Sequence, residues 1–376
     1  MKEKLKNIYS LTFCSILSLQ ILCCFISQNV NSVASRFTSL ASFLLLGLFI
    51  LMQLYTGIME EKRLSLKILL KDKYLVLTCL ASLLALVNLF LIGSNKGALL
   101  TAADMLMAFY ILPDLTLDKK HRFFCFGLLS SLLIWWYCHV RWEFNFNMTG
   151  FIFMLTCFAV LLLLEELKTK GLSYLGFVQV TALITATLLC LLYHARCVLA
   201  GMLIFCLLYL LCPLIAKNKY LSSLLILLST LGSLLFTGLY ILLDRLGLKL
   251  TILYKDILSG RQDIWLELWQ AFCRTPLTGI GSSYKLKSFF IFEVHNGMLD
   301  LLIVHGLPVF LCILILMYRA LYQKLYVQNK NTALLPRRLR ISLSAVFAIL
   351  FTSFFENFFI NSPYLLIVLL LLSSEY

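Results

Sequence analysis

The chain has 376 residues, of which 61% are hydrophobic and only 13% are charged, and its mean hydropathy is +0.93. A soluble domain of this length carries about twice that charged fraction, so the composition excludes a soluble fold and predicts an all-α integral membrane protein. The net charge of +14 would suit a nucleic-acid partner. The basic residues instead fall in short segments between apolar stretches, which argues against nucleic acid and for a protein that contacts membrane lipids.

Twelve apolar stretches are candidates for helices that cross a bilayer. They run near 8–27, 38–59, 74–94, 97–112, 122–139, 148–166, 172–193, 197–216, 220–243, 296–318, 341–359 and 362–373. The fourth and the last are short, so we expect them to be tilted, re-entrant or buried in the bundle. Three lysines precede the first stretch, as in a signal peptide. The stretch 8–27 is about 20 residues long, which is enough to span a bilayer, and no A-x-A cleavage site follows it. We therefore expect an uncleaved helix.

The basic residues also predict an orientation. With both termini in the cytoplasm and alternating spans, the inner segments hold 21 of the 32 lysines and arginines. That excess is the one expected for cytoplasmic segments. The chain then divides into nine transmembrane helices at 1–243, one long external loop with short helices at 244–294, and three further transmembrane helices at 295–376.

Thirteen cysteines raise the question of disulfides or metal sites. Most of them lie inside apolar stretches, and no C-x-x-C pattern occurs. We therefore expect small apolar side chains within membrane helices. The outer segments show no D-x-D pattern and no group of carboxylates and histidines, so neither a metal ion nor a cofactor is predicted.

The external loop and the start of the next span carry the most informative residues, from Ser259 to Gly306. Ser259 and Gln262 form a capping-box pattern, which predicts a helix that starts near Gly260 and ends before Pro276. Its apolar side chains recur at helical spacing, and polar ones occupy the other side. The apolar set is Ile264, Trp265, Leu268, Trp269 and Phe272, and the polar set is Gln262, Glu267, Gln270 and Arg274.

Three positions on the predicted outer face are candidates for chemistry. Arg261 lies in the first turn of that helix, where the helix dipole favours an anion. Arg196 opens an earlier span, and His295 stands beside Asn296 at the entrance of a later one. Each also has an ordinary structural explanation. Arg196 could extend to the membrane interface, His295 could be a hydrogen-bonded interface residue, and Arg261 could pair with a nearby carboxylate of Asp256, Asp263 or Glu267.

The ordered set of motifs resembles the O-antigen ligase/polymerase family. It comprises G-R-x-x-x-W at Gly260, Arg261 and Trp265; P-L-x-G-x-G from Pro276 through Gly279 and Gly281, where a tight turn is expected; and H-N-x-x-L at His295, Asn296 and Leu299, followed by Gly306. Arg196 in H-A-R-C resembles a family motif in which Ser usually stands at the position of Ala195. About 50 residues and Arg196 carry the resemblance.

The resemblance implies a metal-independent, polyprenyl-dependent glycosyltransferase of the bacterial cytoplasmic (inner) membrane. Its donor would be a glycan on undecaprenyl pyrophosphate. A polymerase moves that glycan onto another lipid-linked repeat unit, whereas a ligase moves it onto lipid A core or a comparable acceptor. Other polysaccharide export proteins then become candidate partners.

The chemistry of these residue types agrees with that activity. Two guanidinium groups, those of Arg196 and Arg261, suit the charge that develops on a departing pyrophosphate. An imidazole can take the proton of the acceptor hydroxyl, so His295 is the expected base, with Asn296 or Glu293 as its orienter. Glu356, near the outer end of the eleventh span, is expected to hydrogen-bond an arginine or the acceptor sugar, or to have a structural partner.

A transporter, such as a polysaccharide flippase, is the competing class of protein. Transporters show internal repeats and ionisable residues near the middle of several spans. Most spans here carry no ionisable residue near their middle, and the polar residues gather at one outer entrance, which favours an enzyme. A membrane sensor or scaffold is a third alternative, in which Arg196, Arg261 and His295 would be dispensable.

Overall fold

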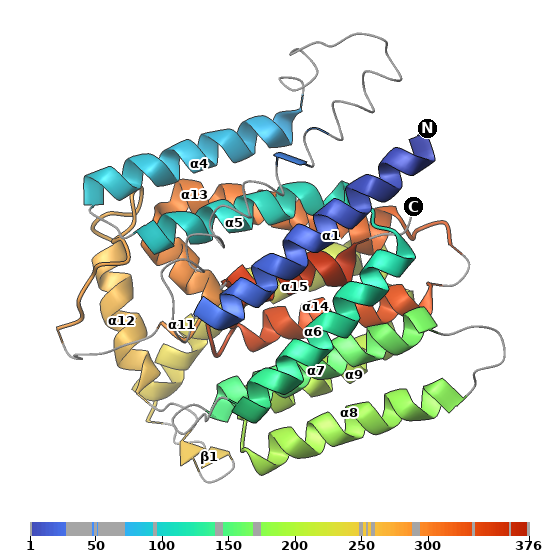
Figure 1. Cartoon of the computed structure of the whole chain (residues 1–376). Helices are drawn as coiled ribbons and strands as arrows, with labels where there is room; N and C mark the ends of the chain where they lie inside the picture. Colours follow the sequence, from blue (N-terminus) through green and yellow to red (C-terminus); the bar gives the residue numbers. More distant parts are fainter. Residues whose placement is uncertain are drawn as a thin grey trace.

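The computed structural model describes residues 2–27, 47–48, 51, 72–92, 96–139, 146–167, 174–247, 251–252, 255–256, 260–287, 294–332, 335–360 and 362–373. Over these residues the chain is almost entirely helical (Figure 1). The longer helices are α1 (Lys2–Ser27), α4 (Lys73–Ile92), α5 (Lys96–Ile111), α6 (Lys119–His139), α7 (Phe146–Leu167), α8 (Tyr174–Leu192), α9 (Arg196–Ile215), α10 (Lys219–Thr230), α11 (Gly232–Arg245), α12 (Arg261–Phe272), α13 (Gly297–Tyr322), α14 (Arg337–Thr352) and α15 (Ser362–Leu372).

Three short helical turns and one two-stranded hairpin lie between them. The short helical turns are η1 (Leu112–Asp114), η2 (Gln323–Val327, a π-helical turn after α13) and η3 (Phe358–Ile360). The strands β1 (Thr251–Ile252) and β2 (Lys255–Asp256) pair antiparallel, with Thr251 opposite Asp256. The expectation of an all-α fold is therefore confirmed, apart from this small hairpin.

Several helices are long and apolar enough to cross a membrane. Among the described residues they are Lys73–Ile92, Thr149–Leu167, Tyr174–Leu192, Arg196–Ile215 and Gly297–Val327. The pair α10 and α11 would add a sixth span if its two bent parts cross together. The other predicted stretches that fall on described residues are also helical, in α1, α5, α6, α14 and α15. The stretch 38–59 lies almost wholly outside the described residues, so the total of twelve spans stays a prediction.

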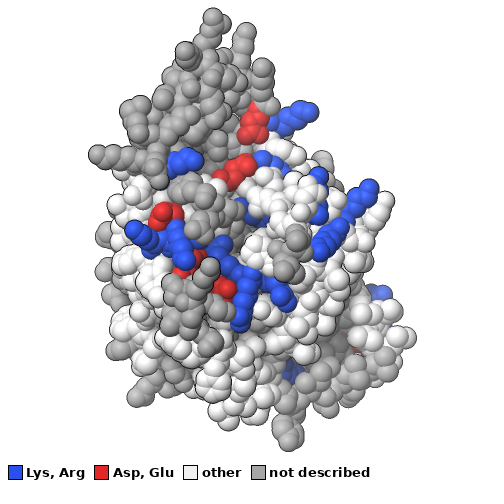
Figure 2. Space-filling model, turned by 90° about the vertical axis from the view of Figure 1, so that its right-hand side faces the viewer, with Lys and Arg blue, Asp and Glu red and all other residues white. Residues whose placement is uncertain are grey.

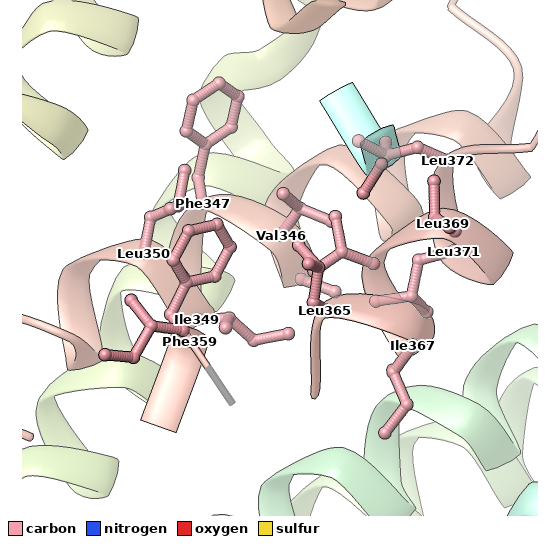
Figure 3. Packing of buried hydrophobic residues seen from close by; sticks show 14 of the residues in the cluster. Val346, Phe347, Ile349, Leu350, Phe359, Leu365, Ile367, Leu369, Leu371 and Leu372 are labelled. Carbon is pink, nitrogen blue, oxygen red and sulfur yellow. The ribbon is translucent and has the colours of Figure 1, made fainter. Parts of the chain in front are cut away.

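The two short predicted spans lie inside the bundle. Helix α15 has only 11 residues, and most of its described side chains are fully buried. A helix that is apolar on every side needs such a buried position or lipid around it. Figure 3 shows side chains of α14, among them Val346 and Ile349, packed near Phe359 and Leu365. The 16 residues of α5 lie between α4, α13 and α15.

Two predicted spans are not single straight helices. The stretch 220–243 forms α10 and α11, which meet at a bend of 53°. The hydroxyl groups of Ser229 and Thr230 both donate to the Ile226 carbonyl, and such side-chain bonds bend helices. The second case is α13, which is broken at Gly306, where φ is 79° and ψ is 165°. Pro308, two residues later, has no N–H to donate to the preceding turn.

One end of the bundle is held by an ion-pair network. The fully buried Arg122 of α6 lies 3.0 Å from Glu166 at the end of α7, and Arg338 at the start of α14 donates to the same carboxylate at 2.7 Å. Arg338 also donates to the carbonyl of Ser373, just after α15. Figure 2 views the molecule from the side on which both termini lie in Figure 1, and Lys and Arg side chains gather there.

Candidate functional site

A second polar cluster lies at the opposite end of α7. Asn147 is in the first turn of α7, and Glu166 of the ion-pair network is in its last turn. A helix rises 1.5 Å per residue, so the two clusters are separated by about 30 Å, close to the thickness of a bilayer core. At this second end, side chains from the starts of α7, α12 and α13 meet at Glu356.

Glu356 is the centre of the cluster, and its side chain is only 1% exposed. Its Oε1 accepts hydrogen bonds from Arg261 Nη2 and from Asn147 Nδ2, both at 2.8 Å. His295 Nδ1 lies 2.7 Å from the other oxygen, Oε2. Burial alone would raise the pKa of this carboxyl, but the His295 hydrogen bond and the Arg261 charge outweigh burial and hold the pKa below its usual value. Glu356 is therefore ionised at neutral pH.

The position of Glu356 differs from the one expected. Helix α14 ends at Thr352, before the predicted end of the span at 359, and the chain turns over residues 353–357. Glu356 thus lies in a turn rather than on a membrane helix. Of the roles predicted for it, the hydrogen bond to an arginine is present in the structure.

Arg261 is the first residue of α12, and two adjacent residues of the turn after α14 fix its guanidinium group. Its Nη1 donates to the Phe355 carbonyl at 2.6 Å, and its Nη2 donates to Glu356. Its ion-pair partner is therefore Glu356, far along the chain. The side chain keeps 17% of its surface exposed. These two contacts use two of the five N–H donors of a guanidinium group.

Helix α12 starts where the sequence predicted. The N-cap residue is Gly260, with φ of 79°. Ser259 itself lies outside the described residues. The predicted apolar face is present, because Trp265, Leu268 and Phe272 are buried. Trp269, predicted on the same face, lies at the edge of that face, and its side chain is 45% exposed.

His295 directly precedes the N-cap of α13 and has a backbone φ of 52°. This left-handed conformation is uncommon for a residue other than glycine, although histidine and asparagine adopt it more often than most. Because Glu356 is ionised, Nδ1 of His295 donates to it, so in the tautomer without a second proton the lone pair lies on Nε2. The side chain is 25% exposed, so it is accessible from outside the bundle.

Asn296, one of the two predicted orienters of His295, has a different role in the structure. Asn296 is fully buried and caps α13, because its Oδ1 accepts from the Leu299 N–H at 3.0 Å and from the Ser233 hydroxyl at 2.7 Å. Its Nδ2 donates to Thr237 and to the Phe354 carbonyl. Asn296 thus joins α11, α13 and the turn after α14. The side chain that orients His295 is Glu356 instead. Glu293 lies outside the described residues.

Aromatic side chains pack against the backbone next to His295 and next to Glu356. Trp265 of α12 is fully buried, and its Nε1 donates to the Val294 carbonyl at 2.5 Å. Its ring lies edge-on to Tyr240 of α11, with 5.0 Å between ring centroids. Phe236 of α11 likewise contacts Phe355, beside Glu356. These contacts fix the backbone on either side of His295 and Glu356, so the cluster is built on packed elements.

Gly279 and Gly281 form the predicted turn, with φ of 77° and 71°. The turn docks on the break in α13, where carbonyls lose their helical partners. The N–H of Ile280 donates to the Ile303 carbonyl at 2.8 Å, and that of Gly281 donates to the Val304 carbonyl at 3.3 Å. A Cβ atom on Gly279 would lie 2.6 Å from these carbonyl oxygens. The two glycines therefore have a structural role.

Arg196 is the first residue of α9 and is partly buried. Its neighbour Ala195 packs closely against Gly150, one turn after Asn147 in α7. Its other neighbour, Cys197, lies within electrostatic reach of both Glu356 and Arg261. Arg196 is thus at the same end of the bundle as the cluster, and a fourth helix begins there.

Sequence reasoning missed Asn147, which has no motif around it and lies 209 residues from Glu356. It also missed Ser233 and Thr237, although their four-residue spacing in an apolar helix marks one polar face. Among the described residues, no three His, Cys, Asp or Glu side chains gather to hold a metal ion. The described cysteines are free thiols, mostly buried in helices.

The fold and the site together define a class of protein only coarsely. The described part of the chain is helical apart from one small hairpin, its apolar helices are compatible with a membrane, and at one end Arg261, His295 and Asn147 surround the buried Glu356. Comparison with family models, with curated proteins and with solved structures found no match.

Proposed function

We propose that this protein is a metal-independent glycosyltransferase of the bacterial cytoplasmic membrane. It polymerises undecaprenyl-pyrophosphate-linked oligosaccharide repeat units into a surface polysaccharide, such as O-antigen, capsule or exopolysaccharide. The observation that carries the proposal is the position of Glu356 between Arg261 and His295. One ionised carboxylate fixes both an anion-binding group and a base.

The proposed reaction needs a base for the acceptor and stabilisation of the leaving group. The acceptor hydroxyl gives its proton to Nε2 of His295 while its oxygen forms a bond to the anomeric carbon of the donor. The bond from that carbon to the pyrophosphate breaks, and the anomeric configuration inverts. Glu356 holds the proton of His295 on Nδ1 and stabilises the imidazolium that forms, as the carboxylate of a catalytic triad does.

The pyrophosphate leaves with additional negative charge. Arg261, whose guanidinium is fixed by Phe355 and Glu356 before the reaction, and Arg196 meet that charge with guanidinium donors. The converging starts of α7, α9, α12 and α13 add the partial positive charge of helix N-termini. This arrangement supplies the electrostatic stabilisation that a divalent ion gives in other glycosyl transfers, so the proposal includes neither metal nor cofactor.

The proposed topology has twelve spans, both termini in the cytoplasm and the cluster on the outer side. Two observations support it. The Arg122–Glu166–Arg338 network lies at the basic end of the bundle, as expected for the cytoplasmic side. The Glu356 cluster lies at the other end of α7, where exported lipid-linked sugars would be presented.

A ligase that moves the finished glycan to an acceptor would use the same cluster. We prefer the polymerase because polymerases of the family that the motifs resemble are expected to be more numerous and more divergent. A flippase is the alternative from another class. It would need ionisable side chains along a path through the bundle, whereas Arg261, His295 and Glu356 are gathered at one end.

The three activities separate in one reconstitution. Purified protein in liposomes receives an undecaprenyl-pyrophosphate-linked repeat unit, and the products are resolved on a gel. A ladder of multiples supports the polymerase. Transfer only when a second acceptor is added indicates the ligase, and movement of the lipid across the bilayer without any new glycosidic bond indicates the flippase.

A further inference from the structure

The two faces of α12 border different sites. Arg261 and the buried Trp265 face the Glu356 cluster and the core. The opposite face presents Asp263, Glu267 and Gln270 at helical spacing, and Arg274 continues the row after the helix ends. This polar row borders a groove of about 980 Å³. That volume is at the upper end of the range for ligand sites.

The other walls of the groove come from distant parts of the chain. The residues Leu91 and Ile92, at the end of α4, form one wall, and the segment from Thr278 to Lys287 forms another. Glu267 joins this segment to α12, because its Oε1 accepts from the Lys287 N–H at 2.7 Å and from the Tyr284 hydroxyl at 3.4 Å. The docking of Ile280 on α13 holds the base of the segment. The groove therefore has fixed walls.

We propose that this groove binds sugar units of the glycan chain that lie away from the reacting bond. The proposal rests on the proposed function and adds to it the place where the chain lies. Sugar hydroxyls both donate and accept, and the groove offers carboxylate acceptors beside amide, guanidinium and ammonium donors. The apolar faces of sugar rings suit the side chains of Leu91, Ile92 and Tyr284.

The charge of the lining argues for such a ligand over a simple anion. The two acidic residues Asp263 and Glu267 balance the two basic residues Arg274 and Lys287. A phosphate or nucleic-acid site would need a net positive lining. Because α12 stands between the groove and Glu356, the bound units would be remote from the bond that is transferred. Binding there would hold a growing chain between successive additions, so its loss would shorten the products.

The test uses lipid-free oligosaccharides of increasing length, cut from the surface glycan of the organism that carries this chain. Binding to the purified full-length protein is measured for wild type, for a Gln270→Ala/Arg274→Ala double variant, for Lys287→Ala and for Lys285→Ala. All four side chains are exposed, so the protein should fold normally. Lys285 is the matched control, since it lies in the same segment but does not line the groove.

We expect the double variant and Lys287→Ala to weaken binding of the longer fragments by about fivefold for each hydrogen bond lost. Lys285→Ala should bind as wild type does. In the reconstituted reaction, the double variant should make shorter chains than wild type does, and Lys285→Ala should make chains of wild-type length. Wild-type affinity in the double variant, or no fragment binding by the wild type, would overturn the groove assignment.

The binding assay needs no transfer, so the two proposals fail separately. If fragment binding depends on Gln270 and Arg274 but the protein transfers no sugar, the groove proposal holds and the proposed enzyme activity is refuted. If transfer depends on Arg261 but the double variant binds fragments and elongates chains normally, the proposed enzyme activity holds and the groove proposal is refuted.

Discussion

His295 and Glu356 are joined by a short contact between their side chains, with 2.7 Å between Nδ1 and Oε2. The two residues are 61 positions apart, and each lies outside a helix, His295 before α13 and Glu356 after α14. Neither position is held by regular backbone hydrogen bonding. Asn296, Trp265 and Phe236 hold the two turns together, so the geometry of the contact depends on packing around it.

The first prediction concerns the charge of Glu356. Glu356→Gln keeps the size of the side chain but removes the negative charge that holds the proton on His295 Nδ1. We expect glycan transfer to fall by about a thousandfold or more, as when a triad carboxylate becomes an amide. Turnover in proteoliposomes measures the effect. Glu165→Gln is the control, because that carboxylate pairs with Arg337 at the other end of the bundle, and it should keep full activity.

A second prediction follows from the lowered pKa of Glu356. A carboxyl whose pKa is lower in the folded state than its ordinary value of 4.5 stabilises the fold above that value. This contribution is lost as the pH falls from 4.5 through the lower folded pKa. The melting temperature is measured against pH for wild type and Glu356→Gln, and the difference between them should shrink as the pH falls below 4.5. A difference that grows on acidification would refute the assigned direction.

The third prediction concerns the docking of the Gly279 turn on the break in α13. Gly306 has a backbone conformation that is essentially restricted to glycine, and an added Cβ would meet the Leu277 carbonyl. Gly306→Ala should destabilise the protein by about 3 kcal/mol or more. Gly176→Ala in α8 is the control, since a Cβ there meets nothing within 4 Å and alanine favours a helix. Thermal unfolding in detergent compares the two, and equal melting temperatures would count against the docked turn.

Asn296 provides the fourth prediction. Asn296→Ala removes a helix cap and leaves the hydroxyl of Ser233 without its buried acceptor. We expect a loss of about 3 kcal/mol in the free energy of unfolding. Asn218→Ala removes only the exposed cap of α10 and should cost about 1 kcal/mol. If both variants unfold at the same temperature, Asn296 does not join α11 and α13 in the way described.

The sequence predicted local features well. The buried face of α12 through Trp265 follows from periodicity, and the tight turn at Gly279 and Gly281 follows from residue type. Burial in the bundle is one of the three placements that the length of α15 predicted. These features depend on neighbours within a few residues. The total number of spans and their orientation stay predictions.

The contacts that assemble the site could not be predicted in this way. Glu356 meets Arg261 across 95 residues and Asn147 across 209 residues, and no periodicity encodes such distances. The bend between α10 and α11 and the break at Gly306 were missed for a related reason. Hydropathy measures how apolar a stretch is, but not whether its backbone stays helical when a partner such as the Gly279 turn can supply hydrogen bonds.

The most direct test of the central claim compares donor binding with turnover for His295→Ala and Arg261→Lys, both reconstituted at wild-type level. As the base acts on the acceptor hydroxyl, His295→Ala should bind the undecaprenyl-pyrophosphate-linked donor almost as wild type does and transfer essentially nothing. Arg261→Lys should bind donor more weakly and retain little activity, because lysine keeps the charge but loses the forked donors. Normal turnover by His295→Ala would contradict the account.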